Sequence, residues 1–215
     1  MERELRRKMK LEDSVGLGAA RMLAVSKSET QIIESSKTLM LSCARLEGLK
    51  NELSLVTKGN FVRVKRSRMA EVSLTDLRIP LAWRQSQENL SDRRKFAIFC
   101  SVTSGAQIFD TGVKIVDRNC ADITFSEAFL FSNMKPEFDI KLDVFCHKLR
   151  GENRGSGPRN WFQKMMGNNP KFLNQRKAMN FKLLTTKHLT VDDCSGINFF
   201  SVYMQMIESY CERFR

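Results

Sequence analysis

The run FDIKLDVFCH at residues 138–147 indicates the fold class, because alternate positions are apolar from Phe138 to Cys146 while the positions between them are mostly polar. A side-chain period of two is typical of a half-buried β-strand. In the run FAIFCSV at residues 96–102, Phe96, Ile98, Cys100 and Val102 occupy alternate positions. Shorter strand candidates lie at residues 71–77, 113–116, 122–125 and 181–191, with turn residues at 110–112 and 135–136. Several short antiparallel strands of this kind predict a β-sandwich.

The chain before this region predicts two helices in residues 1–57, with a break at Ser26-Lys27-Ser28. Ser28 to Gln31 matches a capping box, in which the Ser28 hydroxyl and the Gln31 side chain each bond a free backbone N–H group. In the second helix the apolar residues recur every seven positions at Ile32, Leu39, Leu46 and Leu53, with Leu49 and Val56 beside them. An approximate apolar face in the first helix comprises Leu5, Met9, Val15, Ala19, Met22 and Leu23. A short connection makes the two helices antiparallel neighbours, so the prediction is an α+β fold with a two-helix coiled-coil hairpin before the sandwich.

Positive charge is concentrated outside the predicted strands. The chain has a net charge of +12, and residues 148–190 carry 10 Lys and Arg against 1 acidic residue. We therefore divide the chain into a hairpin at 1–57, a basic linker at 58–70, a sandwich at 71–193 with a long basic loop at about 148–180, and a tail at 194–215. The loop is either a solvated segment or a site for anionic lipid headgroups. The residues expected to contact such a surface are Lys148, Arg150, Arg154, Arg159, Lys164, Lys171, Arg176 and Lys177.

Several function classes are disfavoured by what the sequence contains. Its two histidines, His147 and His188, have no identifiable catalytic partners, and there is no phosphate-binding loop or dinucleotide-binding turn. The six cysteines are scattered without a C-x-x-C pair, and no D-x-D pair suggests calcium, so we expect no metal and no cofactor. The basic segments carry no nucleic-acid recognition motif, so specific nucleic-acid binding is not expected. No apolar run reaches the roughly 18 residues of a membrane-spanning helix, and the N-terminus does not resemble a signal peptide, so a cytosolic protein is expected.

The strand region resembles a known family. The stretch SLTDLRIPLAW at residues 73–83 is its most specific part, followed by RKFAIFC at 94–100, FDT at 109–111, VDR at 116–118, DITF at 122–125 and PEFDI at 136–140. These stretches resemble the anillin-homology region of the rhotekin and anillin-homology family. Segments of the helical part, MLA at 22–24 and KTLM at 37–40, are similar to the Rho-binding hairpin of that family. The resemblance covers roughly residues 15–193 and ends near Val191.

The resemblance implies a non-enzymatic Rho effector or scaffold. In that reading the hairpin binds a Rho-family GTPase in its GTP form, and a C2-like sandwich that is not a calcium sensor links it to actin, septins and the membrane. The cell cortex, the contractile ring and cytokinesis are the implied setting. For the Rho contacts we expect the charged residues Arg6, Arg7, Arg21, Lys50 and Glu52. The alternative is a peripheral membrane adaptor that uses the basic loop and keeps the hairpin for coiled-coil assembly.

Overall fold

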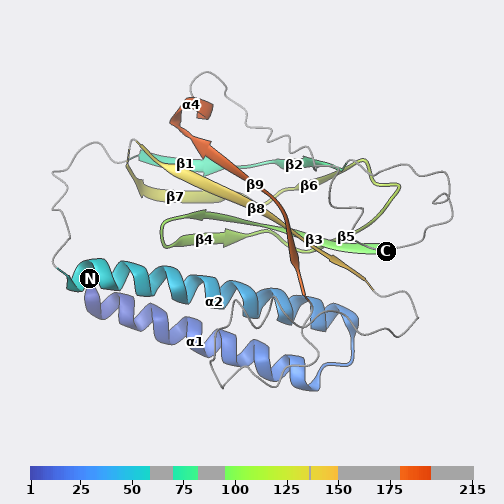
Figure 1. Ribbon diagram of the computed structural model, residues 1–215, viewed down its shortest axis with the longest axis horizontal. Coiled ribbons are helices and arrows are strands. Elements are labelled where there is room, and N and C mark those ends of the chain that lie inside the picture. The colour runs from blue at the N-terminus through green and yellow to red at the C-terminus, as the bar shows by residue number, and fades with distance from the viewer. Residues whose placement is uncertain (59–69, 82–94, 136, 150–179, 195–215) are drawn as a thin grey trace. The chain divides into compact units, whose positions relative to one another are not determined.

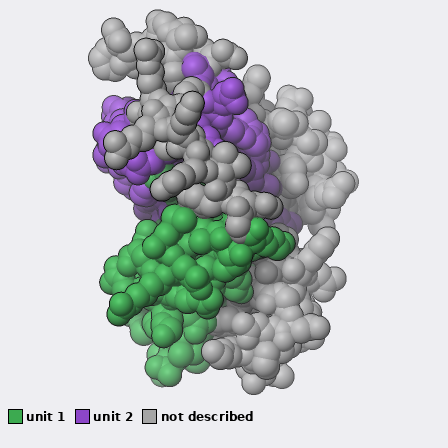
Figure 2. Space-filling view, turned by 90° about the vertical axis from the view of Figure 1, so that its left-hand side faces the viewer, with its two compact units in different colours: residues 1–65, 105–107, 154–181 green, residues 66–104, 108–153, 182–215 purple. Residues whose placement is uncertain are grey.

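The computed structural model describes residues 1–58, 70–81, 95–135, 137–149 and 180–194. Two helices come first and antiparallel β-strands follow, which confirms the predicted α+β class (Figure 1). The chain divides into two compact units, one built on the helices and the other on the strands (Figure 2). None of the described helices is long and apolar enough to span a membrane.

The helices are α1, Glu2–Val25, and α2, Glu29–Thr57, and the break falls at residues 26–28 as predicted. The Ser26 amide and hydroxyl both donate to the Met22 carbonyl, which closes α1. Ser28 is the N-cap of α2, and its carbonyl accepts from the amide of Ile32 at 3.1 Å. The predicted capping box is wrong, because the Ser28 side chain makes no capping hydrogen bond. Ser28 is exposed, so water can satisfy the free N–H groups at this helix start.

Small residues of α1 form the contact between the two helices. Ala19, Ala20 and Leu23 of α1 pack with Leu39 of α2, and Ile32 lies against them. Gly16 is buried, and a Cβ built on it would lie 3.5 Å from the Cβ of Ser42, so the helix backbones approach closely there. Ile32 and Leu39 thus contact α1 as the heptad pattern predicts.

The predicted apolar face of α1 is wrong at two positions, because Val15 and Met22 are exposed. The buried contact face is formed instead by small residues, Gly16, Ala19 and Ala20. Hydropathy alone gives such small residues little weight, so this face was not recognised. The single stripe predicted for α2 is also too narrow. Apolar residues off that stripe are buried as well, namely Ile33, Met40 and Leu41.

The strands form one larger sheet and two strand pairs (Figure 1). The larger sheet has the order β4-β3-β8-β9, with β5 also on β3; its strands are β3 Lys95–Ser104, β4 Gln107–Asp110, β5 Lys114–Asp117, β8 Asp139–Lys148 and β9 Lys182–Thr190. The two pairs are β1 Ala70–Leu74 with β7 Phe129–Met134, and β2 Leu77–Pro80 with β6 Asp122–Phe125. A single helical turn, α4 Val191–Cys194, follows β9. The predicted strands correspond to elements here, whereas β2, β4 and β7 were not predicted as strands.

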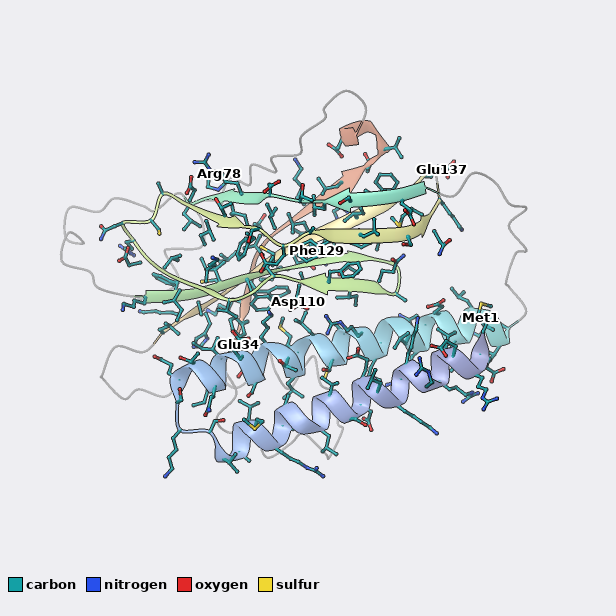
Figure 3. The ribbon with its side chains drawn as sticks, turned by 180° about the vertical axis from the view of Figure 1, so that it is seen from behind. Met1, Glu34, Arg78, Asp110, Phe129 and Glu137 are labelled. Atoms are coloured by element: carbon teal, nitrogen blue, oxygen red, sulfur yellow. The ribbon has the colours of Figure 1, made fainter. Side chains whose placement is uncertain are left out.

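One apolar core joins the sheet to the strand pairs. The alternating residues of β3 and β8, Ile98, Cys100, Val102, Ile140, Leu142 and Val144, are all buried in it. From the other side come Leu77, Ile79, Phe125, Phe129 and Phe131. Figure 3 shows Phe129 between the two layers. Two layers around one core are compatible with the predicted sandwich, and the C2-like topology remains a prediction.

The stretch DLRIPL at residues 76–81 has a structural explanation. Asp76 adopts a left-handed conformation with φ 53°, so the strand predicted at 71–77 ends early as β1, and the separate strand β2 begins at Leu77. Leu77, Ile79 and Leu81 alternate into the core. Arg78 lies outside and forms an ion pair with Asp122 on β6 (Figure 3). Three buried apolar side chains and one unusual backbone conformation therefore account for this motif, and its role is in folding.

Thr111 joins β4 and β5 into one interrupted strand along β3. Its hydroxyl accepts from the Cys100 amide at 2.9 Å, and its own amide donates to the Cys100 carbonyl at 3.0 Å. The side chain is fully buried. The hydroxyl thus supplies an acceptor that a continuous strand would have provided from its backbone.

Candidate protein-binding surface

The two helices of the hairpin pack against each other through an interface of small and apolar side chains. At the interface, burial raises the pKa of the Cys43 thiol, and the positive charge of Lys50 partly opposes this rise. A thiol that stays neutral beside Leu39 and Ile32 adds to the apolar contact between the helices. The charged residues of α1, by contrast, are mostly exposed.

Two of the predicted Rho contacts, Arg6 and Arg7, form ion pairs within α1. Arg6 pairs with Glu2 at 2.8 Å, and Arg7 pairs with Glu4 at 2.9 Å. The Arg7 hydrogen bond lowers the pKa of Glu4, and Glu4 raises the pKa of Arg7. Both arginines are exposed, so each pair contributes little to stability and its arginine remains accessible to a partner.

The five predicted contacts do not form one patch. At about 100° per residue, Arg7 and Arg21 lie on the same side of α1, whereas Arg6 is turned away by about 100°. Lys50 is exposed and Glu52 half-buried on α2, and by the same spacing they lie about 160° apart around that helix. Arg7 and Arg21 are therefore the pair that one flat partner surface could contact together.

Sequence reasoning missed the apolar residues on the outside of α1. Leu11, Val15, Met22 and Val25 are 62, 38, 46 and 70% exposed, respectively. Two of them had been predicted to pack against the second helix. Their spacing of four, seven and three residues was a signal that could have identified them as one face.

Most of the predicted anionic-surface residues lie outside the described residues. Lys148, at the end of β8, is described and half-buried. Arg150, Arg154, Arg159, Lys164, Lys171, Arg176 and Lys177 lie outside the described ranges, so lipid binding by this loop stays a prediction.

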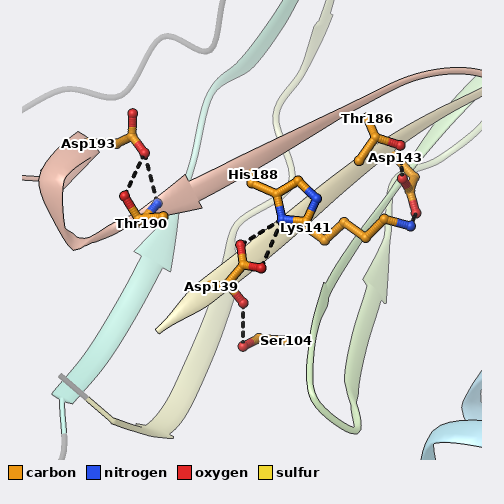
Figure 4. A network of polar contacts seen from close by, with 8 residues as sticks. All are labelled: Ser104, Asp139, Lys141, Asp143, Thr186, His188, Thr190 and Asp193. Carbon is orange, nitrogen blue, oxygen red and sulfur yellow. Dashed lines mark hydrogen bonds and ion pairs between the residues drawn. The ribbon is translucent and has the colours of Figure 1, made fainter. Parts of the chain in front are cut away.

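The face of β8 and β9 opposite the core residues Ile140, Leu142 and Val144 carries a ladder of polar contacts (Figure 4). His188 Nδ1 lies 2.8 Å from a carboxylate oxygen of Asp139, and Asp143 accepts from Lys141 and Thr186 at 2.7 and 2.6 Å. Beyond them, the amide and hydroxyl of Thr190 donate to Asp193, which lowers the pKa of that carboxyl. These groups satisfy one another across two strands, and their arrangement is that of a structural ladder. Among the described residues no group of three or more potential ligands is placed to hold a metal ion.

Comparison with known proteins gives the following relatives. The family described as "Cell division protein anillin" matches residues 68–195. Rhotekin-2 of Mus musculus is 30% identical over 177 residues, which cover 75% of this chain and 29% of that protein. Rhotekin-2 of Homo sapiens is 32% identical over 154 residues (66% and 25%), and Rhotekin of Mus musculus is 28% identical over 173 residues (73% and 31%). The chain thus spans between a quarter and a third of the length of these curated relatives.

Proposed function

This chain belongs to the anillin family, and from that premise we propose that it is a non-enzymatic effector whose helical hairpin binds a Rho-family GTPase in the GTP-bound form. The main support for this proposal is the position of the hairpin. An antiparallel two-helix hairpin, α1 with α2, stands directly before the region that matches the family, in a chain similar to Rhotekin and Rhotekin-2.

The structure of the hairpin suits this role. Its helices hold each other through Gly16, Ala19, Leu23 and Leu39, so α1 can present a rigid face without refolding. Binding then costs little conformational entropy, because both helices are already ordered. Preference for the GTP form would arise on the partner, since the γ-phosphate orders the switch loops of a GTPase and hydrolysis releases them.

A pull-down with the full chain tests the proposal. The chain is immobilised and offered a Rho GTPase loaded with either a non-hydrolysable GTP analogue or GDP. We expect retention of the GTP form, with affinity at least about tenfold above that for the GDP form, equivalent to about 1.4 kcal/mol. Equal retention of both forms, or of neither, would contradict the effector role.

A link to the cytoskeleton is the next part of the proposal. The family description names cell division, which supports a place for this chain at the cell cortex or contractile ring, with actin and septins as partners. Co-sedimentation with actin filaments and with septin filaments, each with and without the GTPase, tests this link. Absence of the chain from both pellets would contradict it.

Membrane binding is the second candidate function, favoured by the excess of 10 basic residues over 1 acidic residue in residues 148–190. Each Lys or Arg near an anionic surface contributes on the order of 1 kcal/mol. We expect the chain to float with vesicles containing phosphatidylserine and to stay behind with neutral phosphatidylcholine vesicles. The variant R154E/R159E should float less with the anionic vesicles, and equal flotation with both vesicle types would contradict this function.

A further inference from the structure

Helix α1 carries an exposed apolar stripe beside the face that packs against α2. Leu11, Val15, Met22 and Val25 lie within an arc of about 80° at the helical repeat. The buried residues Ala19, Leu5 and Leu23 lie outside that arc, about 40° to 80° beyond its edge at Val15. Four exposed apolar residues on one face of one helix are more than scattered surface residues, and such a face is typical of an interaction site.

Gly18 lies in the middle of this stripe, and because it has no side chain, the helix backbone is accessible there. A Cβ built at Gly18 would meet no atom within 4 Å. A side chain from a partner could therefore reach the helix backbone between Val15 and Met22. Glycine at an exposed position in a helix costs about 1 kcal/mol relative to alanine, so this opening has a stability cost that a binding role would explain.

A row of basic residues runs along one edge of the stripe. Arg3, Lys10 and Arg21 lie within about 20° of one another around α1, on the side of the stripe away from α2. All three are exposed. Within the described part of the chain, none of their side chains forms a hydrogen bond or an ion pair. Their charges are therefore available to a partner that supplies carboxylates.

This charge arrangement selects among the possible occupants. A second copy of the chain would place the same basic row against or beside its own, and like charges across an interface disfavour association. An anionic membrane would match the charges, but membrane-surface helices present a broad apolar face with Trp, Phe and Leu. The stripe here is narrow, has no aromatic residue and is interrupted by Gly18. A folded protein surface with an apolar centre and an acidic rim fits these features.

We propose that this face of α1, with Leu11, Val15, Met22 and Val25 at its centre and Arg3, Lys10 and Arg21 along its edge, is the surface on which the GTPase docks, through an apolar patch of the GTPase that is rimmed by carboxylates. The inference rests on the proposed function and assigns that function to one side of one helix. It also distinguishes the Rho contacts predicted from sequence that lie on this face from those that do not. Arg21 belongs to the docking face, whereas Lys50 and Glu52 belong to α2 and lie outside it.

The test measures binding of full-chain variants to the GTPase loaded with a GTP analogue. The variant L11E/M22E places carboxylates in the apolar centre, and L11A/M22A removes the apolar side chains without adding charge. The matched control is I115E, because Ile115 on β5 is 51% exposed and far from α1 in the sequence. All these positions are exposed, so circular dichroism should show unchanged helix content.

We expect L11A/M22A to weaken binding about tenfold and L11E/M22E to weaken it more, while I115E binds like the wild type. Charge complementarity adds a second readout. Wild-type affinity should fall as salt is raised, and R21E should bind more weakly and with a smaller dependence on salt.

The outcomes separate the inference from the proposed function. If the wild type binds the GTP form and L11E/M22E binds equally well, the docking face is wrong and the effector role stands. If the wild type binds neither nucleotide form, both are overturned. A wild-type dimer in light scattering that L11E/M22E abolishes would assign the stripe to a second copy. Flotation with anionic vesicles that L11E/M22E abolishes would assign it to a membrane, and either result overturns the inference.

Discussion

The two helices approach closely at Gly16, so we expect the effect of a substitution there on the free energy of unfolding to change sign with the size of the new side chain. The three variants are Gly16→Ala, Gly16→Leu and Gly18→Ala, all in α1. At Gly18 a new Cβ meets open space, and at Gly16 it lies 3.5 Å from the Cβ of Ser42, an ordinary van der Waals distance. Leucine at 16 must also fit beside Leu39, whose Cδ1 would lie 3.9 Å from the first added carbon.

The magnitudes follow from helix propensity and from packing. Replacing glycine by alanine in a helix stabilises by about 1 kcal/mol, so Gly18→Ala should raise the free energy of unfolding by about that amount, and Gly16→Ala by the same amount or slightly less. Leucine has nearly the helix propensity of alanine, so the difference between Gly16→Leu and Gly16→Ala isolates overpacking. That difference should be about 1–3 kcal/mol in favour of alanine.

Urea denaturation of the full chain, followed by far-UV circular dichroism, measures the three values. Gly18→Ala serves as the matched control, because it changes propensity without changing the interface. If Gly16→Leu were as stable as Gly16→Ala, the helices would not approach closely at this residue and the hairpin packing described here would be wrong.

Three further predictions concern buried groups. Thr111→Val keeps the shape of a buried side chain but removes the acceptor of the Cys100 amide, so it should destabilise by about 1–3 kcal/mol in urea denaturation, and an unchanged midpoint would contradict the bridging role. Ile79→Ala should cost about 2–5 kcal/mol and Arg78→Ala less than about 1 kcal/mol, because Ile79 is fully buried and Arg78 forms an exposed ion pair; the reverse order would refute a folding role for this motif. Burial raises the pKa of the Cys43 thiol above its ordinary value of 9.0, so the stability that this neutral thiol contributes is fully present below pH 9.0 and is lost as pH rises through the raised pKa. Unfolding measured from pH 7 to 10.5 should show this loss in the wild type and not in Cys43→Ala, and N-ethylmaleimide should modify Cys43 more slowly in the folded chain than in urea.

The parts of the fold that could be predicted are those where one periodicity dominates. Apolar residues at alternate positions located the two central strands, β3 and β8, and the break at residues 26–28 located the helix boundary. The strand β4 was missed because it is four residues long and half-buried throughout. The split between β1 and β2 was missed because it depends on the left-handed backbone of Asp76, which side-chain hydropathy does not report.

The candidate site was harder to predict for a physical reason. A single helix sequence shows which residues are apolar, but two apolar faces compete to be the buried one. Val15 and Met22 fitted a helical face as well as Leu5 and Leu23 did, and the face that turns inward is the one on which Gly16, Ala19 and Ala20 let the helices approach closely. The charged residues gave even less information, because exposed arginines occur all round α1.

The central claim is that the hairpin recognises the nucleotide state of a Rho GTPase. Calorimetric titration of the full chain against the GTPase loaded with a GTP analogue, and in parallel with GDP, tests it most directly. The account predicts saturable one-to-one binding to the GTP form and at least about tenfold weaker binding to the GDP form. Equal affinity for the two forms, or no heat of binding with either, would contradict it.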